Sequence, residues 1–223
     1  MSILTRLMES FRSRGAGLSE SVPAVEPEEE IEQEMGPSTL IVGLGNPGLD
    51  YSATRHNMGF LCLDRVATKH RLRFTGKRGK SVLARGSING HDVALAKPQT
   101  FMNLSGESVR ELLRIYKLPT TALLVVYDDV DLPPGTVRIR ERGGPGTHNG
   151  MRSIVDEIGT TDFPRLRIGV GMPTGGEKLA DYVLGLPSAE ERTLLDEALE
   201  RSVEAIETVA RRGIGAAMNR FNA

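Results

Sequence analysis

The stretch TLIVGLGNPG, residues 39–48, decides the fold. After Thr39 it continues as an apolar run rich in β-formers, which is typical of a strand buried on both faces of a sheet. Asn46-Pro47-Gly48 ends the run, because proline lacks a backbone donor and glycine favours a turn. We therefore predict a central strand whose carboxyl end opens into a polar loop.

Outward from this strand, helical and strand-like patterns alternate along the chain. Apolar spacing predicts helices over 58–70, 104–117, 150–159 and 188–212. Short runs of β-formers predict further strands over 81–88, 91–96, 122–127, 136–142 and 165–171. Asn89-Gly90 joins two of these strands in a hairpin. The alternation predicts the α/β class: a single three-layer α/β/α domain with a mixed, mostly parallel sheet, in which the hairpin supplies the antiparallel part.

Charge is distributed unevenly along the chain. Residues 1–36 carry 3 Arg and 8 Glu, a net charge of −5, so we expect a disordered acidic extension before a folded domain over 37–223. The apolar spacing within 3–11 also fits a short amphipathic helix. Within 37–187, 20 basic residues outnumber 14 acidic ones, a modest positive footprint for a polyanionic partner. A solvated surface explains the same surplus equally well.

Several classes of protein are excluded by composition. No segment approaches the roughly 18 consecutive apolar residues of a membrane helix, and the start lacks the apolar core of a secretory signal. We therefore expect a cytoplasmic protein without membrane partners. The one cysteine, Cys62, has no partner for an internal disulfide. It stands in the apolar run 59–63 and is predicted to be a packed thiol, not a nucleophile.

Four loops beside predicted strands are rich in polar residues, and such loops collect the binding groups of α/β sheets. They are 45–57, 97–106, 127–135 and 143–150. His56 lies in the first loop, and Asp128 ends the buried strand before the third. A carboxylate there is well placed to accept a hydrogen bond from the histidine ring and fix its tautomer. The alternative is that Asp128 and Asp131 only cap the turn that follows.

Two other kinds of site fit these loops less well. GLGNPG, residues 43–48, has the glycine spacing of a dinucleotide-binding loop. Pro47 removes a donor, however, where a helix N-terminus should hold the pyrophosphate. Ser105 is a candidate nucleophile, but its surroundings lack the pattern of a nucleophile elbow and fit the start of the following helix better.

A metal site is the third alternative. His56, His148 and Asp128 all carry side chains that bind zinc. None of them is paired at helical spacing, and a single cysteine removes the thiolate frameworks, so we expect neither a metal nor another cofactor.

Three asparagines, Asn46, Asn103 and Asn149, stand in three different loops. A neutral amide donates to a carbonyl or a developing oxyanion and accepts from a peptide N–H, without favouring any side-chain charge. Each asparagine alone is more typical of a turn former. Together, around one histidine and one aspartate, they favour a functional role.

Five segments carry a resemblance: VGLGNPGLDYSATRHNMGF, KPQTFMNLSG, DDVDLPPG, GTHNGMRSI and FPRLRIGVG. From about Thr39 to the C-terminus, the chain resembles peptidyl-tRNA hydrolase of the bacterial type. The resemblance implies a monomeric, cofactor-free α/β/α enzyme that cuts the ester between a peptide and the 3′-terminal ribose of tRNA, releasing tRNA for translation. A non-catalytic RNA-binding member of the same fold is the alternative, since some organellar relatives act in splicing.

The resemblance also implies which residues do the chemistry. His56 corresponds to the catalytic base, Asp128 to the acid that orients it, and Asn46 to the residue that holds the substrate carbonyl. The sequence departs from the family pattern at Pro145 and Thr147, which bear on the mobility of their loop.

Four further residues correspond to substrate contacts. Asn103 and Asn149 match residues that bind peptide backbone and water. Met102 matches an apolar wall beside the site, and Tyr51 matches a contact to the tRNA end. The implied partner is therefore the acceptor stem and CCA end of a peptidyl-tRNA.

Arginines alternate with apolar residues in two predicted strands. In VRIRER, residues 137–142, a period of two places all three arginines on one solvent-facing side. The same alternation predicts that Arg165 and Arg167 are exposed. A solvated strand face is one explanation, but the resemblance assigns Arg140 and Arg167 to the 5′-terminal phosphate of tRNA. Guanidinium groups bind phosphate oxygens bidentately.

Overall fold

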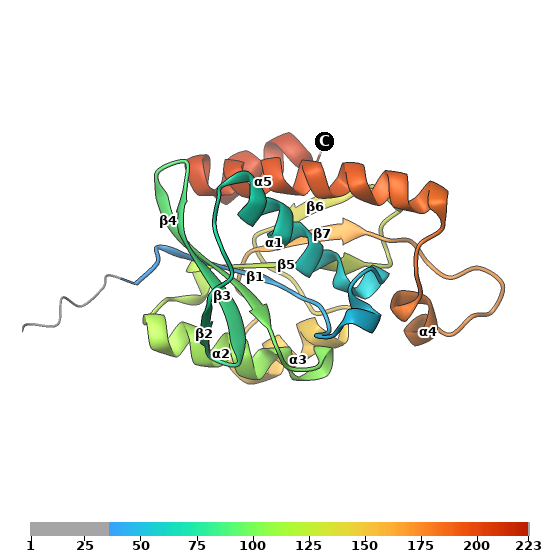
Figure 1. Ribbon diagram of the computed structural model, residues 1–223, viewed down its shortest axis with the longest axis horizontal. Helices are drawn as coiled ribbons and strands as arrows, with labels where there is room; N and C mark the ends of the chain where they lie inside the picture. Colours follow the sequence, from blue (N-terminus) through green and yellow to red (C-terminus); the bar gives the residue numbers. More distant parts are fainter. Residues whose placement is uncertain (1–35, 223) are drawn as a thin grey trace, which may run out of the picture. The chain divides into compact units, whose positions relative to one another are not determined.

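Seven strands form one sheet in the order β2-β3-β4-β1-β5-β7-β6, within residues 36–222, the part of the chain that this computed structural model describes (Figure 1). The strands are β1 Thr39–Gly43, β2 Gly76–Arg78, β3 Ser81–Ile88, β4 His91–Pro98, β5 Leu123–Asp129, β6 Val137–Arg140 and β7 Arg165–Gly169. The central strands β4, β1, β5 and β7 are parallel to one another. Antiparallel pairs flank them on both sides. We predicted that the hairpin alone supplies the antiparallel part. That prediction is incomplete, because β6 also runs antiparallel to β7.

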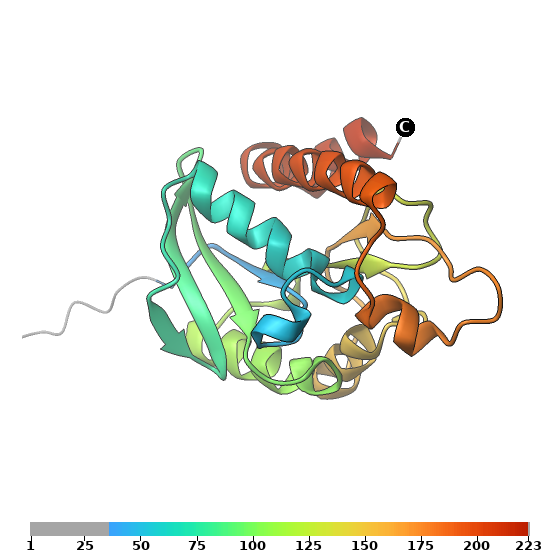
Figure 2. The ribbon, with the colours of Figure 1, turned by 45° about the vertical axis from the view of Figure 1, so that its right-hand side comes forward.

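Helices cover both faces of the sheet. They are α1 Met58–Lys69, α2 Ser105–Tyr116, α3 Asn149–Ile158, α4 Leu179–Leu184 and α5 Ala189–Phe221. Figures 1 and 2 show α1 and α5 on one face and α2 and α3 on the other, which confirms the three-layer α/β/α prediction. The prediction omitted β2 and α4, since each is too short to produce a periodic pattern.

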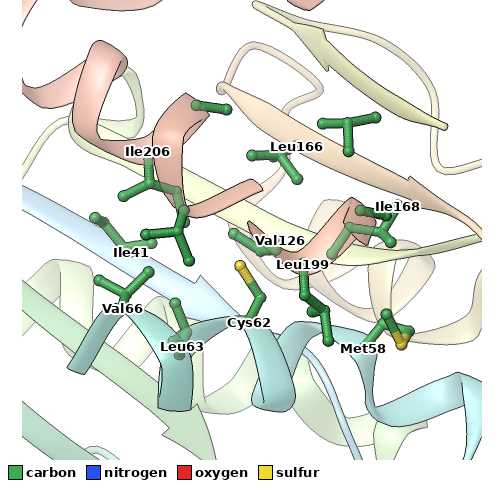
Figure 3. Close-up of a cluster of buried hydrophobic side chains, with 14 of the residues drawn as sticks. Ile41, Met58, Cys62, Leu63, Val66, Val126, Leu166, Ile168, Leu199 and Ile206 are labelled. Carbon is green, nitrogen blue, oxygen red and sulfur yellow. The ribbon is translucent and has the colours of Figure 1, made fainter. Parts of the chain in front are cut away.

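The larger core lies between the sheet and the α1–α5 layer (Figure 3). Ile41 of β1 faces this layer, whereas its neighbours Leu40 and Val42 face α2 and α3, as the period of two in a strand requires. Cys62 is fully buried in this core, and burial raises the pKa of its thiol to about 12. It is a packed, inert thiol, as predicted.

Two glycines bring α1 into direct contact with the sheet. A Cβ on Gly59 would lie 2.3 Å from the backbone nitrogen of Leu44 and from the carbonyl oxygen of Val126. A Cβ on Gly43 would lie 2.3 Å from the carbonyl oxygen of Gly59. Any side chain at either position would push the helix away. The amino end of α1 therefore rests on the carboxyl ends of β1 and β5, where the polar loops begin.

The last helix bends where the predicted helix ends. We predicted a helix over 188–212, and α5 continues to Phe221 after leaving helical geometry at Gly213 (φ 81°, ψ 171°). Its start is capped by Ser188 and Glu191, whose side chains bond each other's backbone N–H. None of the helices within 36–222 is long and apolar enough to cross a membrane. The predictions for the acidic extension, 1–36, fall almost wholly outside the described residues.

Candidate active site

His56 and Asp128 meet at the carboxyl end of β5. His56 lies in a 3-10 turn, Arg55–Asn57, immediately before α1. Its Nδ1 atom is 3.0 Å from each carboxylate oxygen of Asp128. An ionised carboxylate only accepts hydrogen bonds, so Nδ1 carries the proton and Nε2 keeps a free lone pair. That lone pair is the feature a general base requires.

A second histidine, His148, binds the same carboxylate. Its Nε2 atom is 3.1 Å from Oδ1 of Asp128, and its Nδ1 atom accepts a hydrogen bond from the backbone N–H of Met151 at 3.2 Å. The N–H group fixes the tautomer: Nδ1 is unprotonated and Nε2–H donates to Asp128. From the sequence we assigned His148 no role except as a possible metal ligand. One signal in the sequence could have predicted its structural role: His148 stands just before a predicted helix, where polar side chains cap the first turn.

Asp128 and His56 each shift the pKa of the other toward the charged form. Burial raises the pKa of Asp128, but the charges and hydrogen bonds of His56 and His148 outweigh burial and hold that pKa well below its usual range. Burial lowers the pKa of His56, but the charge and hydrogen bond of Asp128 outweigh it, so the pKa of His56 is raised. Asp128 therefore stays ionised and stabilises a proton that arrives on His56.

The same three side chains have the composition of a metal site. The fold brings ligand atoms of His56, Asp128 and His148 within 4.8 Å of one another, so our argument against a metal from sequence spacing does not hold. The hydrogen bonds supply a different argument. A metal on His148 Nε2 would require the proton to move to Nδ1, where it would face the Met151 N–H. The donor set fits a hydrogen-bonded cluster better than a metal.

Asn46 is fixed at the carboxyl end of β1 by two partners. Its side-chain Oδ1 accepts from the Met102 N–H at 2.8 Å, which leaves the amide nitrogen as a donor. Asn57 holds its backbone: Asn57 Oδ1 accepts from the Asn46 N–H at 2.8 Å, and Asn57 Nδ2 donates to the Asn46 carbonyl at 3.0 Å. Because Asn57 follows His56 directly, it ties the candidate base to the candidate donor. The sequence prediction missed this role of Asn57.

A cleft of about 560 Å³ is lined by His56, Asp128 and His148 and by residues of β7 and β6, the two strands beyond β5. Its lining includes His56, Asp128, Asn149, Leu179, Val183, Arg140 and Arg167. The cleft thus combines a free base nitrogen with four guanidinium groups, those of Arg140, Arg152, Arg165 and Arg167. That combination suits a substrate with an uncharged reacting group and a separate anionic group.

The family model of peptidyl-tRNA hydrolase matches residues 40–223. The chain belongs to the peptidyl-tRNA hydrolase family. The peptidyl-tRNA hydrolase of Chloroflexus aggregans is 55% identical over 184 residues, 82% of this chain and 98% of the relative. That of Roseiflexus castenholzii is 57% identical over 185 residues, 82% of this chain and 86% of the relative. The crystal structure of peptidyl-tRNA hydrolase from Acinetobacter baumannii matches with a TM-score of 0.80 and 39% identity, covering 85% of this chain and 96% of that one.

The remaining positions taken from the peptidyl-tRNA hydrolase resemblance lie in the loops 45–57 and 97–106, which the hydrogen bond between Met102 and Asn46 joins. Met102 is buried with its N–H bound to Asn46, and Asn103 follows it on the surface. Tyr51 is half-buried in the turn Leu49–Tyr51. None of these residues is in the lining of the cleft. The predicted residues therefore fall into two sets: those that line the cleft, and Asn46, Tyr51, Met102 and Asn103, which do not.

Three arginines depart from the predicted exposure, and one of them is Arg167, which is half-buried with a side chain only 16% exposed. Arg165 is only 1% exposed, so its predicted exposure is wrong. Loops fold across this face, and the guanidinium donates to the carbonyl oxygens of Gly143, Gly144, Thr161 and Phe163. Arg138 is half-buried and donates to the carbonyl of Asn222. Of the three arginines in 137–142, Arg140 and Arg142 alone are exposed.

Proposed function

We propose that this protein hydrolyses the ester between a peptide and the 3′-terminal ribose of tRNA, which returns the tRNA to translation. One observation carries the proposal: the Nε2 atom of His56 is left as a free base because its Nδ1 atom is bound to the buried, ionised Asp128. An ester is an activated acyl group, so one base and a few neutral donors suffice to cleave it.

The reaction begins with a water molecule held by His56. Nε2 takes a proton from the water as its oxygen bonds to the ester carbonyl carbon, and the carbonyl π electrons move to the oxygen. When the tetrahedral intermediate collapses, the bond to the ribose oxygen breaks, and His56 returns the proton to that leaving oxygen. The products are the peptide acid and free tRNA. Asp128 stabilises the charged imidazole between the two steps.

Three asparagines supply the hydrogen bonds. The free amide nitrogen of Asn46 donates to the carbonyl oxygen and stabilises the oxyanion. Asn103, which follows the Met102 wall, binds the first peptide bond, and Asn149 in the cleft positions the water. A side chain placed to hydrogen-bond a peptide bond disfavours a substrate with a free amino group. In that complex the donor and acceptor of the side chain would be covered by substrate but left without a partner.

The tRNA is held by its phosphates. Arg140 and Arg167, which line the cleft, bind the 5′-terminal phosphate, while Tyr51 contacts the CCA end. Phosphate contacts carry no base information, so the acceptor stem is gripped independently of sequence. We assign the protein to the cytoplasm as a monomer without a cofactor, in line with the resemblance.

Selective hydrolysis tests the proposal. Release of free tRNA is measured from N-acetyl-aminoacyl-tRNA and, in parallel, from unblocked aminoacyl-tRNA. The proposal requires rapid release from the blocked substrate only, and Asn103→Ala should reduce that preference. Binding of both tRNAs without release from either would favour the non-catalytic RNA-binding alternative.

A further inference from the structure

Two adjacent aspartates at the end of β5 serve different partners. Side chains alternate across a strand, so Asp128 and Asp129 point to opposite faces of the sheet. Asp128 binds the two histidines, whereas Asp129 forms an ion pair with Arg167 between Oδ2 and Nε. The hydrolytic mechanism uses Asp128 and Arg167 but leaves Asp129 without a role.

Asp129 is held in a single orientation. Its side chain is only 9% exposed, and its second oxygen, Oδ1, accepts from the backbone N–H of Asp131 at 2.9 Å. Arg167 pairs in register with Tyr127, two residues before Asp129, so all three side chains share one face of the sheet. A carboxylate with both oxygens engaged fixes the guanidinium that it binds.

The ion pair leaves the outer end of Arg167 available. Asp129 occupies Nε, and the two terminal nitrogens have no hydrogen-bond partner within 36–222. Burial lowers the pKa of Arg167, but the hydrogen bond and charge of Asp129 outweigh burial and raise it, so the group stays charged. These nitrogens form the face of a guanidinium that binds phosphate oxygens bidentately.

The surrounding charge also favours an anion. Arg140 lines the same cleft. Arg165 adds a further positive charge nearby, and its donors bind backbone carbonyls, with no hydrogen bond to a carboxylate within 36–222. All three arginines line the cleft. Burial lowers the pKa of Arg165, and the charges of Arg167 and Arg140 lower it further against the opposing effect of Tyr127.

We propose that Asp129 is a positioning residue for tRNA recognition: it holds Arg167 by Nε so that both terminal nitrogens meet the 5′-terminal phosphate. The inference rests on the proposed function, which assigns Arg167 to that phosphate. Two effects of Asp129 oppose each other, since its carboxylate orients the guanidinium and repels the phosphate. Orientation dominates, because the carboxylate lies at the Nε edge of the guanidinium and its own charge is already paired.

The test compares deacylated tRNA carrying a 5′-phosphate with the same tRNA after phosphatase treatment. The dissociation constant of each is measured for the wild-type protein, Asp129→Ala and Arg167→Ala. We expect the wild-type protein to prefer the phosphorylated tRNA by roughly tenfold or more, as a charge-assisted hydrogen bond supplies. Asp129→Ala should reduce this ratio to about threefold or less and should have no further effect in the Arg167→Ala background. Asp156→Ala, which removes an exposed carboxylate outside the cleft lining, should leave the ratio unchanged.

A merely structural role would weaken binding of both tRNAs and preserve their ratio. An unchanged ratio in Asp129→Ala overturns the inference, and so does an increased ratio, which would mean that the carboxylate only repels. If Asp129→Ala does not fold, Asp129→Asn replaces it, because a neutral amide oxygen accepts from one of the two donors but not both. Failure of the proposed function appears separately, as absence of ester hydrolysis by the wild-type protein.

Discussion

Asp128→Asn is the substitution whose effect the structure constrains most tightly. Asp128 is 1% exposed and accepts hydrogen bonds from Nδ1 of His56 and Nε2 of His148. Asparagine preserves the shape but offers one acceptor and one donor in place of two acceptors. One histidine must then change its tautomer or lose its hydrogen bond. The charge that stabilises protonated His56 is lost in either case.

The magnitude follows from the distance between the charges. Two unit charges about 4 Å apart attract by about 4 kcal/mol at an effective dielectric constant of about 20. Part of this energy is lost from the transition state, in which His56 is protonated. Since about 1.4 kcal/mol corresponds to a factor of ten, we predict that kcat falls by roughly 10²–10³. KM should change little, because Asp128 does not touch the bound peptide or phosphate.

The pH profile gives this prediction a second readout. Asp128 raises the pKa of His56, and the base works only when neutral, so wild-type activity falls as the pH drops through that raised pKa. In Asp128→Asn the pKa of His56 is lower, so the acidic limb should move to lower pH while the plateau falls. Single-turnover release of tRNA from N-acetyl-aminoacyl-tRNA measures both, with Asp156→Asn, at an exposed position outside the cleft lining, as the control. A plateau within threefold of wild type and an unmoved limb would refute the reasoning.

Three further outcomes are expected. Arg140→Ala and Arg167→Ala should each raise KM similarly for different tRNAs and leave kcat largely intact. Each should also lower the slope of the logarithm of the tRNA binding constant against the logarithm of the salt concentration by roughly one unit. Unaltered slopes and KM would place the tRNA elsewhere on the protein. Prolonged dialysis against EDTA should leave activity unchanged, and a loss that zinc restores would revive the metal site. Deleting residues 1–36 should leave kcat and Tm nearly unchanged, whereas a fall in Tm of many degrees would show that the extension packs on the domain.

Most of the fold follows from local patterns. The run from Leu40 to Gly45 predicts the buried central strand, and Asn89-Gly90 predicts the hairpin turn, because each signal lies within a few neighbouring residues. The antiparallel return of β6 could not be predicted in this way, since strand direction depends on the path of the long loop over 141–148. The bend at Gly213 coincides with the predicted helix end, but continuation to Phe221 depends on packing against the sheet.

The site was predictable where a residue type alone defines the chemistry, and less so where tertiary contacts do. His56 and Asp128 are identified by residue type and by their loops. Arg165 was misassigned because strand alternation predicts exposure, whereas carbonyl oxygens from the loop at Gly143 and from Thr161, just before β7, satisfy its buried charge. His148 and Asn57 act through hydrogen bonds to atoms that only the fold brings within reach, so no periodic pattern in the sequence predicts them.

The most direct test of the central claim is turnover by His56→Ala, measured beside its affinity for tRNA. Single-turnover hydrolysis of N-acetyl-aminoacyl-tRNA is followed for the wild type and the variant, and the Kd for deacylated tRNA is measured for both. We predict that the variant loses a factor of roughly 10²–10⁴ in kcat, the usual contribution of a general base. Its Kd should stay near the wild-type value, because the imidazole acts on water and not on phosphate. Near-normal turnover by His56→Ala would contradict the account.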